Sequence, residues 1–105
     1  MLSRVQELYT LRRPAEVLGF LNAHPDILPL LLEAYPHVAQ HFGPSPVVFL
    51  EVVKDPETND EGQLAAFIRT GLEPAEALAR LDSLDKSWWL EASRRSQAPL
   101  CIHLE

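Results

Sequence analysis

The sequence predicts an α+β fold in which N-terminal helices precede a β-β-α-β unit. Residues 1–43 place apolar side chains at helical spacing between prolines. Residues 46–105 instead begin and end with short runs of β-branched, aromatic and other apolar residues, and Pro74 opens an amphipathic helix between those runs. We therefore expect one domain over 1–105, with a helical part in 1–43 and a ββαβ part in 46–105.

Three helices are expected in the N-terminal part. The first carries apolar residues at helical spacing over 2–9. Pro14 suits the first position of the second helix, and His24-Pro25 ends it because a residue before proline avoids the α region. The third helix, over 26–42, is apolar nearly all round and should be buried, whereas Pro36 should kink or interrupt it.

Three strands are expected at 47–53, 63–70 and 100–104, and a polar hairpin tip over 54–62 joins the first two. A crossover through the Pro74 helix should place the third strand beside the first. This gives a small three-stranded antiparallel sheet in the order 2-1-3. Both faces of the sheet carry apolar residues, so the N-terminal helices should cover the second face. A face left uncovered would be an interface.

Trp88 and Trp89 follow Asp85, which is expected to act as the N-cap of a fresh short segment. Adjacent residues on a helix point about 100° apart, so only one of the two rings can lie centrally in the core. The other ring should reach the rim, either covering the preceding helix or anchoring a partner, because tryptophan is enriched at binding hot spots.

Composition narrows the class of protein. The lone Cys101 excludes an internal disulfide and multi-cysteine metal sites, and a single thiol fits a reducing compartment. The first seven residues carry charge where a signal peptide needs an apolar stretch. The longest apolar run, 27–32, is far too short to cross a bilayer. We expect a cytoplasmic protein with no membrane association.

Acidic residues concentrate in the segment 46–85. The whole chain has a net charge of −6, and this segment alone holds nine acids against three basic residues. Four of the acids lie in the expected hairpin tip: Asp55, Glu57, Asp60 and Glu61. An acidic surface repels phosphate backbones, so nucleic-acid binding is not expected. It would steer a basic partner toward the protein.

No catalytic, cofactor or metal site is predicted. Glu33, His37 and His41 recur every four residues, but Pro36 interrupts them and they lack the spacing of a zinc-protease motif. The acidic hairpin tip lacks the mid-loop glycine and closing glutamate of a calcium loop. Glycine-rich phosphate loops and nucleophile motifs are also missing from the sequence.

Several motifs resemble those of a group of small prokaryotic proteins. They are the Asp55-Pro56-Glu57 turn and the element Asp85-x-x-Trp88-Trp89-Leu90, with the upstream Phe20-Leu21-x-x-His24-Pro25 and the final run 100–105. The likeness covers most of the chain. It implies a prokaryotic cytoplasmic protein of the kind encoded in toxin–antitoxin-like gene pairs, and hence a partner. It transfers no catalytic residue.

Three functional hypotheses remain open. The favoured one is a non-catalytic protein–protein interaction module, antitoxin-like, that uses its acidic surface and an apolar patch containing tryptophan. Its partner-binding residues would be Asp55, Glu57, Asp60, Glu61, Trp88 and Trp89. The alternative is a small hydrolase or nuclease with Asp26, Glu33, His37, His41 and Glu51 in one cleft between helices and sheet.

The third hypothesis, nucleic-acid binding, requires the basic side chains of both chain ends to form one patch against the acidic background. These are Arg4, Arg12, Arg13, Arg94 and Arg95. Homodimerisation is compatible with all three hypotheses.

Overall fold

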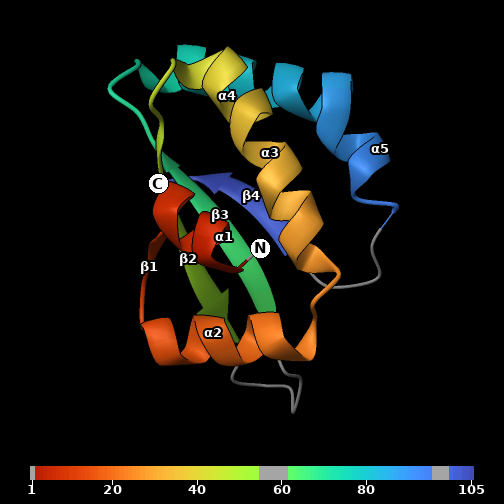
Figure 1. Cartoon of the computed structure of the whole chain (residues 1–105). Helices are drawn as coiled ribbons and strands as arrows, with labels where there is room; N and C mark the ends of the chain where they lie inside the picture. The colour runs from red at the N-terminus through yellow and green to blue at the C-terminus, as the bar shows by residue number, and fades with distance from the viewer. Residues whose placement is uncertain (1, 55–61, 96–99) are drawn as a thin grey trace.

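The α+β class is confirmed by the computed structural model of the chain, which describes residues 2–54, 62–95 and 100–105. In chain order its elements are α1 (Leu2–Leu8), β1 (Thr10–Leu11), α2 (Pro14–Ala23), α3 (Ile27–Phe42), β2 (Val47–Val53), β3 (Gln63–Arg69), α4 (Pro74–Leu84), the π-helical turn η1 (Asp85–Trp89), α5 (Leu90–Ala92) and β4 (Leu100–Leu104). The helices gather on one side of the sheet (Figure 1).

The sheet is mixed and has four strands in the order β1-β2-β3-β4. β2 and β3 form the expected antiparallel hairpin, with Phe49 directly opposite Phe67. β1 pairs parallel with β2, and β4 pairs parallel with β3. The predicted three-stranded antiparallel sheet in the order 2-1-3 is therefore wrong, because the last strand lies beside the second predicted strand and not beside the first.

Two physical causes explain the observed order. β1 already occupies part of the outer edge of β2, and the Arg12 N–H donates to the Leu50 carbonyl at 2.9 Å. The long helical connection after β3 also suits a parallel neighbour, because parallel strands need a crossover of a dozen or more residues. A strand of only Thr10 and Leu11 has no periodicity, so the sequence does not signal it.

The core lies between the helices and one face of the sheet. Val48, Leu50 and Val52 of β2 alternate into it, as do Leu64, Ala66 and Ile68 of β3. Buried residues of α1, α2, α3 and α5 belong to this same cluster. The expectation that the N-terminal helices cover the opposite face is therefore wrong. Glu51, Gln63 and Arg69 alternate onto that face, and covering them with a helix would remove polar and charged groups from water at a cost.

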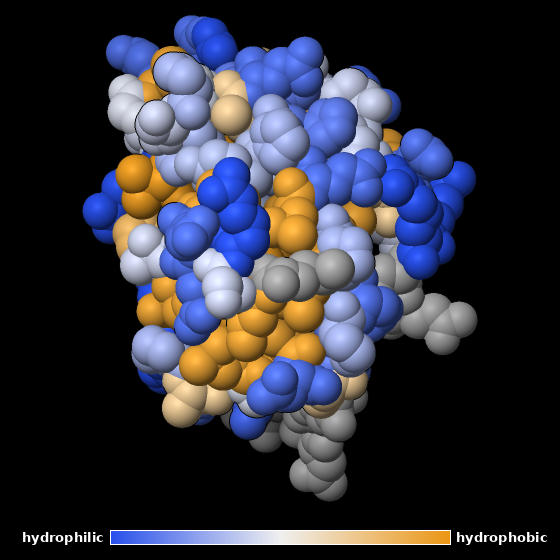
Figure 2. All heavy atoms as spheres, viewed as in Figure 1, coloured by the Kyte–Doolittle hydropathy of each residue, from blue (hydrophilic) through white to orange (hydrophobic). Residues whose placement is uncertain are grey.

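α1 is fixed against α3 by a buried tyrosine. The Tyr9 hydroxyl donates to the Leu31 carbonyl at 2.7 Å, and the Tyr9 ring meets Tyr35 edge-on at 5.7 Å between centroids. Burial raises the pKa of Tyr9 above its ordinary value, because the interior disfavours the phenolate. Figure 2 shows that apolar side chains gather between α1 and α2 on the helical side of the molecule.

α3 runs unbroken through Pro36. α4 likewise passes through η1 into α5 without a break, and Asp85 has right-handed helical angles. The expected fresh start at Asp85 is therefore wrong. Leu84, Trp88 and Ala92 are buried at every fourth position. A π turn contains more residues than an α turn, so it keeps this spacing of four in phase with the core.

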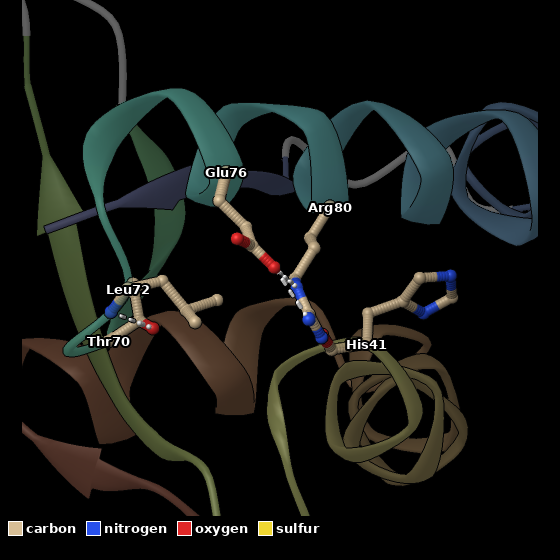
Figure 3. A network of polar contacts seen from close by, with 5 residues as sticks. All are labelled: His41, Thr70, Leu72, Glu76 and Arg80. Carbon is tan, nitrogen blue, oxygen red and sulfur yellow. Dashed lines mark hydrogen bonds and ion pairs between the residues drawn. The ribbon is translucent and has the colours of Figure 1, made fainter.

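Arg80 connects α4 to the end of α3 (Figure 3). Its Nη1 donates to the His41 carbonyl at 2.8 Å, and its Nη2 lies 2.8 Å from Glu76 Oε1. An arginine is well suited to this position, because the last carbonyls of a helix lack intrahelical donors. Before α4, the Thr70 hydroxyl accepts from the Leu72 N–H at 3.2 Å.

Candidate functional site

The sheet face opposite the core, named here the open face, is covered by none of the described helices. By alternation it carries Val47, Phe49, Glu51 and Val53 of β2, Gln63, Ala65, Phe67 and Arg69 of β3, and Cys101 and His103 of β4. Val47 and Val53 are 45% and 38% exposed. Ala65 is buried without belonging to the core cluster, so its neighbours on the open face cover it.

An aromatic row crosses the middle of the open face. Phe49 and Phe67 are cross-strand partners, and Phe67 is in turn aligned with His103, whose ring centroid lies 5.9 Å away. Two guanidinium groups stack on Phe49: that of Arg12 at 4.2 Å from the ring centroid and that of Arg69 at 4.8 Å. These cation–π contacts hold the arginine side chains flat against the sheet.

Carboxylates complete the polar frame around the row. Glu105 pairs with Arg12 and, at 2.9 Å, with Arg69. Arg13, which has a left-handed backbone (φ 49°), reaches Glu51 at 3.5 Å and Glu16 at 3.8 Å. Every arginine near the row therefore has an acidic partner within the chain. At the centre of the open face the Phe49 and Phe67 rings are half-buried, with the Arg12 guanidinium 5.7 Å from the Phe67 centroid.

The predicted partner-binding residues fall into two groups. Asp55, Glu57, Asp60 and Glu61 lie outside the described residues. Trp88 is only 5% exposed, whereas Trp89 is half-buried beside it at 5.7 Å between ring centroids. One ring of the pair is thus central in the core and the other lies nearer the surface, as the helical geometry predicts.

Glu33, His37 and Trp88 form a separate cluster between α3 and η1. Trp88 Nε1 donates to Glu33 Oε1 at 3.0 Å, and the His37 ring stacks on Trp88 at 4.7 Å. Arg95 donates to both Glu33 oxygens at 3.0 Å. His41 turns back to the His37 carbonyl. Within the described part of the chain, no group of three or more acidic, histidine or cysteine side chains could hold a metal ion.

The pKa of Glu33 is lowered, first by the hydrogen bond from Arg95 and then by that from Trp88. A group whose pKa is lowered by folding stabilises the fold at pH values above the ordinary glutamate pKa, and this stability is lost as the pH falls through the folded-state pKa.

We expect Glu33→Gln to flatten the acid side of the pH–stability profile. Urea unfolding between pH 3 and 7 measures this. Glu7→Gln, which breaks an exposed pair with Arg4, should leave the profile unchanged.

The residues required by the two other hypotheses do not all meet in one place. Asp26 and Glu33 line one surface pocket, and His37 and His41 follow Glu33 along α3, whereas Glu51 lies on the open face. The arginines are also dispersed: Arg12 and Arg13 border the open face, Arg4 pairs with Glu7, and Arg95 pairs with Glu33. Neither a carboxylate–histidine cleft nor a single basic patch forms among these side chains.

Cys101 lies on the open face, and its Sγ is 3.7 Å from the Leu64 carbonyl. Burial raises the pKa of the thiol, which disfavours the reactive thiolate. His103, the next residue of β4 on the same face, lies 5.9 Å from Phe67 between ring centroids. The geometry supports a structural thiol.

Sequence reasoning missed the arginine–phenylalanine stack. The sequence contains part of the signal for this stack, because Phe49 and Phe67 alternate with the core residues of their strands. Arg12 could not be placed beside them without knowing that β1 exists, and Glu105 could not be placed without the parallel register of β4.

Comparison with known proteins identifies no relative of the chain. No protein family, curated protein or solved structure matches it. Among the described helices, none is long and apolar enough to cross a membrane.

Proposed function

We propose that this chain is a non-catalytic protein–protein interaction module of a prokaryotic cytoplasm, antitoxin-like in kind, which binds a basic protein through its open face. The observation that carries the proposal is the Phe49–Phe67 row, flanked by the exposed Val47 and Val53, on a sheet face that no described helix covers. Apolar surface of this kind on a sheet face is typical of a binding surface.

Short-range binding would come from the aromatic row. The two rings are rigid side chains that can be desolvated at low entropic cost, and aromatic residues dominate binding hot spots. The stacked Arg12 and Arg69 are already paired with Glu105, so a partner need not neutralise them. A matching apolar patch on the partner would cover the centre of the open face, and polar contacts would surround it.

Long-range attraction would come from the net charge of −6. A field of this sign raises the association rate of a basic protein, and salt screens the effect. Asp55, Glu57, Asp60 and Glu61 supply much of this charge on the connection between β2 and β3, the two central strands of the open face. We expect their reversal to lysine to slow association in low salt, with less effect in high salt.

The test is differential capture of partners from an extract of the native host. The tagged wild type is compared with Phe49→Ser/Phe67→Ser, and Leu78→Ser is the control because Leu78 is a 60% exposed apolar residue on α4. A basic protein should bind the wild type and the control at low salt and be released at moderate salt. With the purified partner, the double variant should bind at least about 30-fold more weakly, the loss expected for a hot spot worth about 2 kcal/mol.

Circular dichroism must first establish that the double variant is folded, which we expect because neither ring belongs to the core cluster. A partner that binds this variant as tightly as the wild type would disprove use of the open face. A partner retained independently of salt and of charge reversal would disprove electrostatic steering.

A further inference from the structure

Among the described residues, β4 forms a free outer edge of the sheet. β4 is the last strand of the sheet (Figure 1), and no described element pairs with its far side. Natural edge strands are usually protected by charged side chains, proline, bulges or very short length. β4 has five residues, Leu100–Leu104, and none of them is charged or proline. β1, the opposite edge, is by contrast only two residues long.

The parallel pairing with β3 fixes which backbone groups of β4 are unpaired. In a parallel pair, alternate residues direct both their N–H and C=O groups to the neighbouring strand. The Glu105 N–H donates to the Ile68 carbonyl at 3.0 Å, so Cys101 and His103 face β3 in the same way. The backbone groups of Leu100, Ile102 and Leu104 therefore face outward.

The sequence of β4 is nearly symmetric about Ile102, with leucine at both ends. We infer that β4 pairs antiparallel with β4 of a second copy of this chain, about a two-fold axis at Ile102. In that register Leu100 lies opposite the partner's Leu104, and Ile102 lies opposite its own symmetry mate. All three outward-facing residues then form hydrogen-bonded pairs, while Cys101 and the partner's His103 form non-hydrogen-bonded pairs. The two sheets become one continuous sheet.

This register is preferred over its neighbours. Side chains must keep their faces, so the register can shift only in steps that preserve the alternation. Each such shift leaves at least one outward-facing residue of each strand without a partner residue in β4. In the centred register, apolar side chains meet apolar side chains on the core side. A pocket of about 430 Å³ lined by Leu72, Leu78 and Leu104 adds apolar surface at one end of the strand.

His103→Cys provides a register-specific test. Residues of a non-hydrogen-bonded pair have Cα atoms about 4.5 Å apart, within the range of a disulfide. The introduced thiol would therefore face the partner's Cys101 and form a cross-link under mild oxidation. Within one chain the two thiol-bearing residues lie about 7 Å apart on one strand face, which is too far for a bond. Val53→Cys is the matched control, because it places an exposed cysteine on the same sheet face of β2.

At about 50 µM protein, the His103→Cys variant should cross-link at least about tenfold faster than the control, because pairing raises the effective thiol concentration to the millimolar range. The untreated wild type should have twice the 11.8 kDa mass of one chain by light scattering. Equal cross-linking of both variants would overturn the inference, whether the wild type is monomeric or dimeric, because a dimer would then use another surface.

The inference does not rest on the proposed function, because its test needs no partner protein. The two can also be separated by salt. Two copies of net charge −6 repel each other, so added salt should strengthen the dimer, whereas it should weaken binding of a basic partner. A dimer that dissociates as salt rises would contradict the uncharged strand pairing proposed here.

Discussion

Leu84→Ala is expected to lower the free energy of unfolding by about 2–5 kcal/mol. Leu84 is fully buried where α4 passes into η1, and its truncation removes apolar contacts and leaves a cavity that the rigid surroundings cannot fill. A domain of this size has a total stability of about 5–15 kcal/mol. The variant should therefore melt at least about 10 °C below the wild type. Urea unfolding and thermal melts followed by circular dichroism measure both quantities.

Leu78→Ala is the matched control, because it makes the same chemical change six residues earlier on the same helix. Leu78 is 60% exposed, so its truncation should change stability by no more than about 0.5 kcal/mol. Equal losses for the two variants would show that α4 does not pack on the sheet through Leu84, and the single core cluster described above would be wrong.

The local elements of the fold were predictable because their signals are short-range. Alternation and β-branched content predicted the strands at 47–53 and 63–70, and the structure has them as Val47–Val53 and Gln63–Arg69. Proline at the first helical position predicted the starts of α2 and α4. Proline fixes its own backbone angle, whereas the alternating β-branched residues suit a half-buried pleated strand, and both signals lie within a few residues of sequence.

The strand order was not predictable in the same way, because it depends on long-range competition. A two-residue strand at Thr10–Leu11 has no periodicity, yet it takes part of the edge of β2 and favours the β4 position beside β3. The continuous helix through Asp85 was missed for a similar reason. Asp85 is a good N-cap residue in isolation, but the burial of Leu84 and Trp88 on either side of it favours an unbroken helix.

For the candidate site, the sequence predicted only that one face of the sheet would need either a covering helix or a partner. Apolar residues on both faces of the hairpin indicated that one face needed a cover or a partner, and the structure leaves the face of Phe49 and Phe67 without a helix. The sequence also drew attention to the tryptophan pair, whose more buried member is a core residue. A pair of adjacent aromatic residues does not itself indicate which ring is buried, because that depends on the phase of the helix.

Because the helix phase buries Trp88, we expect its truncation to be strongly destabilising. Trp88→Ala should lower the free energy of unfolding by about 3–5 kcal/mol, because Trp88 is almost fully buried between α3 and η1. The change also removes the Trp88 Nε1–H that donates to Glu33 and the ring on which His37 stacks. Trp88→Phe should restore most of the apolar packing without the donor, and its stability should lie between those of Trp88→Ala and the wild type.

Trp89→Ala is the control, because Trp89 is the neighbouring residue in η1 and is only half-buried. Its truncation should cost about 1–2 kcal/mol, since less apolar surface is removed from contact. The rings can also be told apart by fluorescence: emission from the variant that keeps only Trp88 should lie at shorter wavelength and resist quenching by acrylamide. If Trp89→Ala were the more destabilising change, the helix would have the opposite phase. In that case η1 would not keep Trp88 aligned with Leu84 and Ala92, and Glu33 would pair with Arg95 alone.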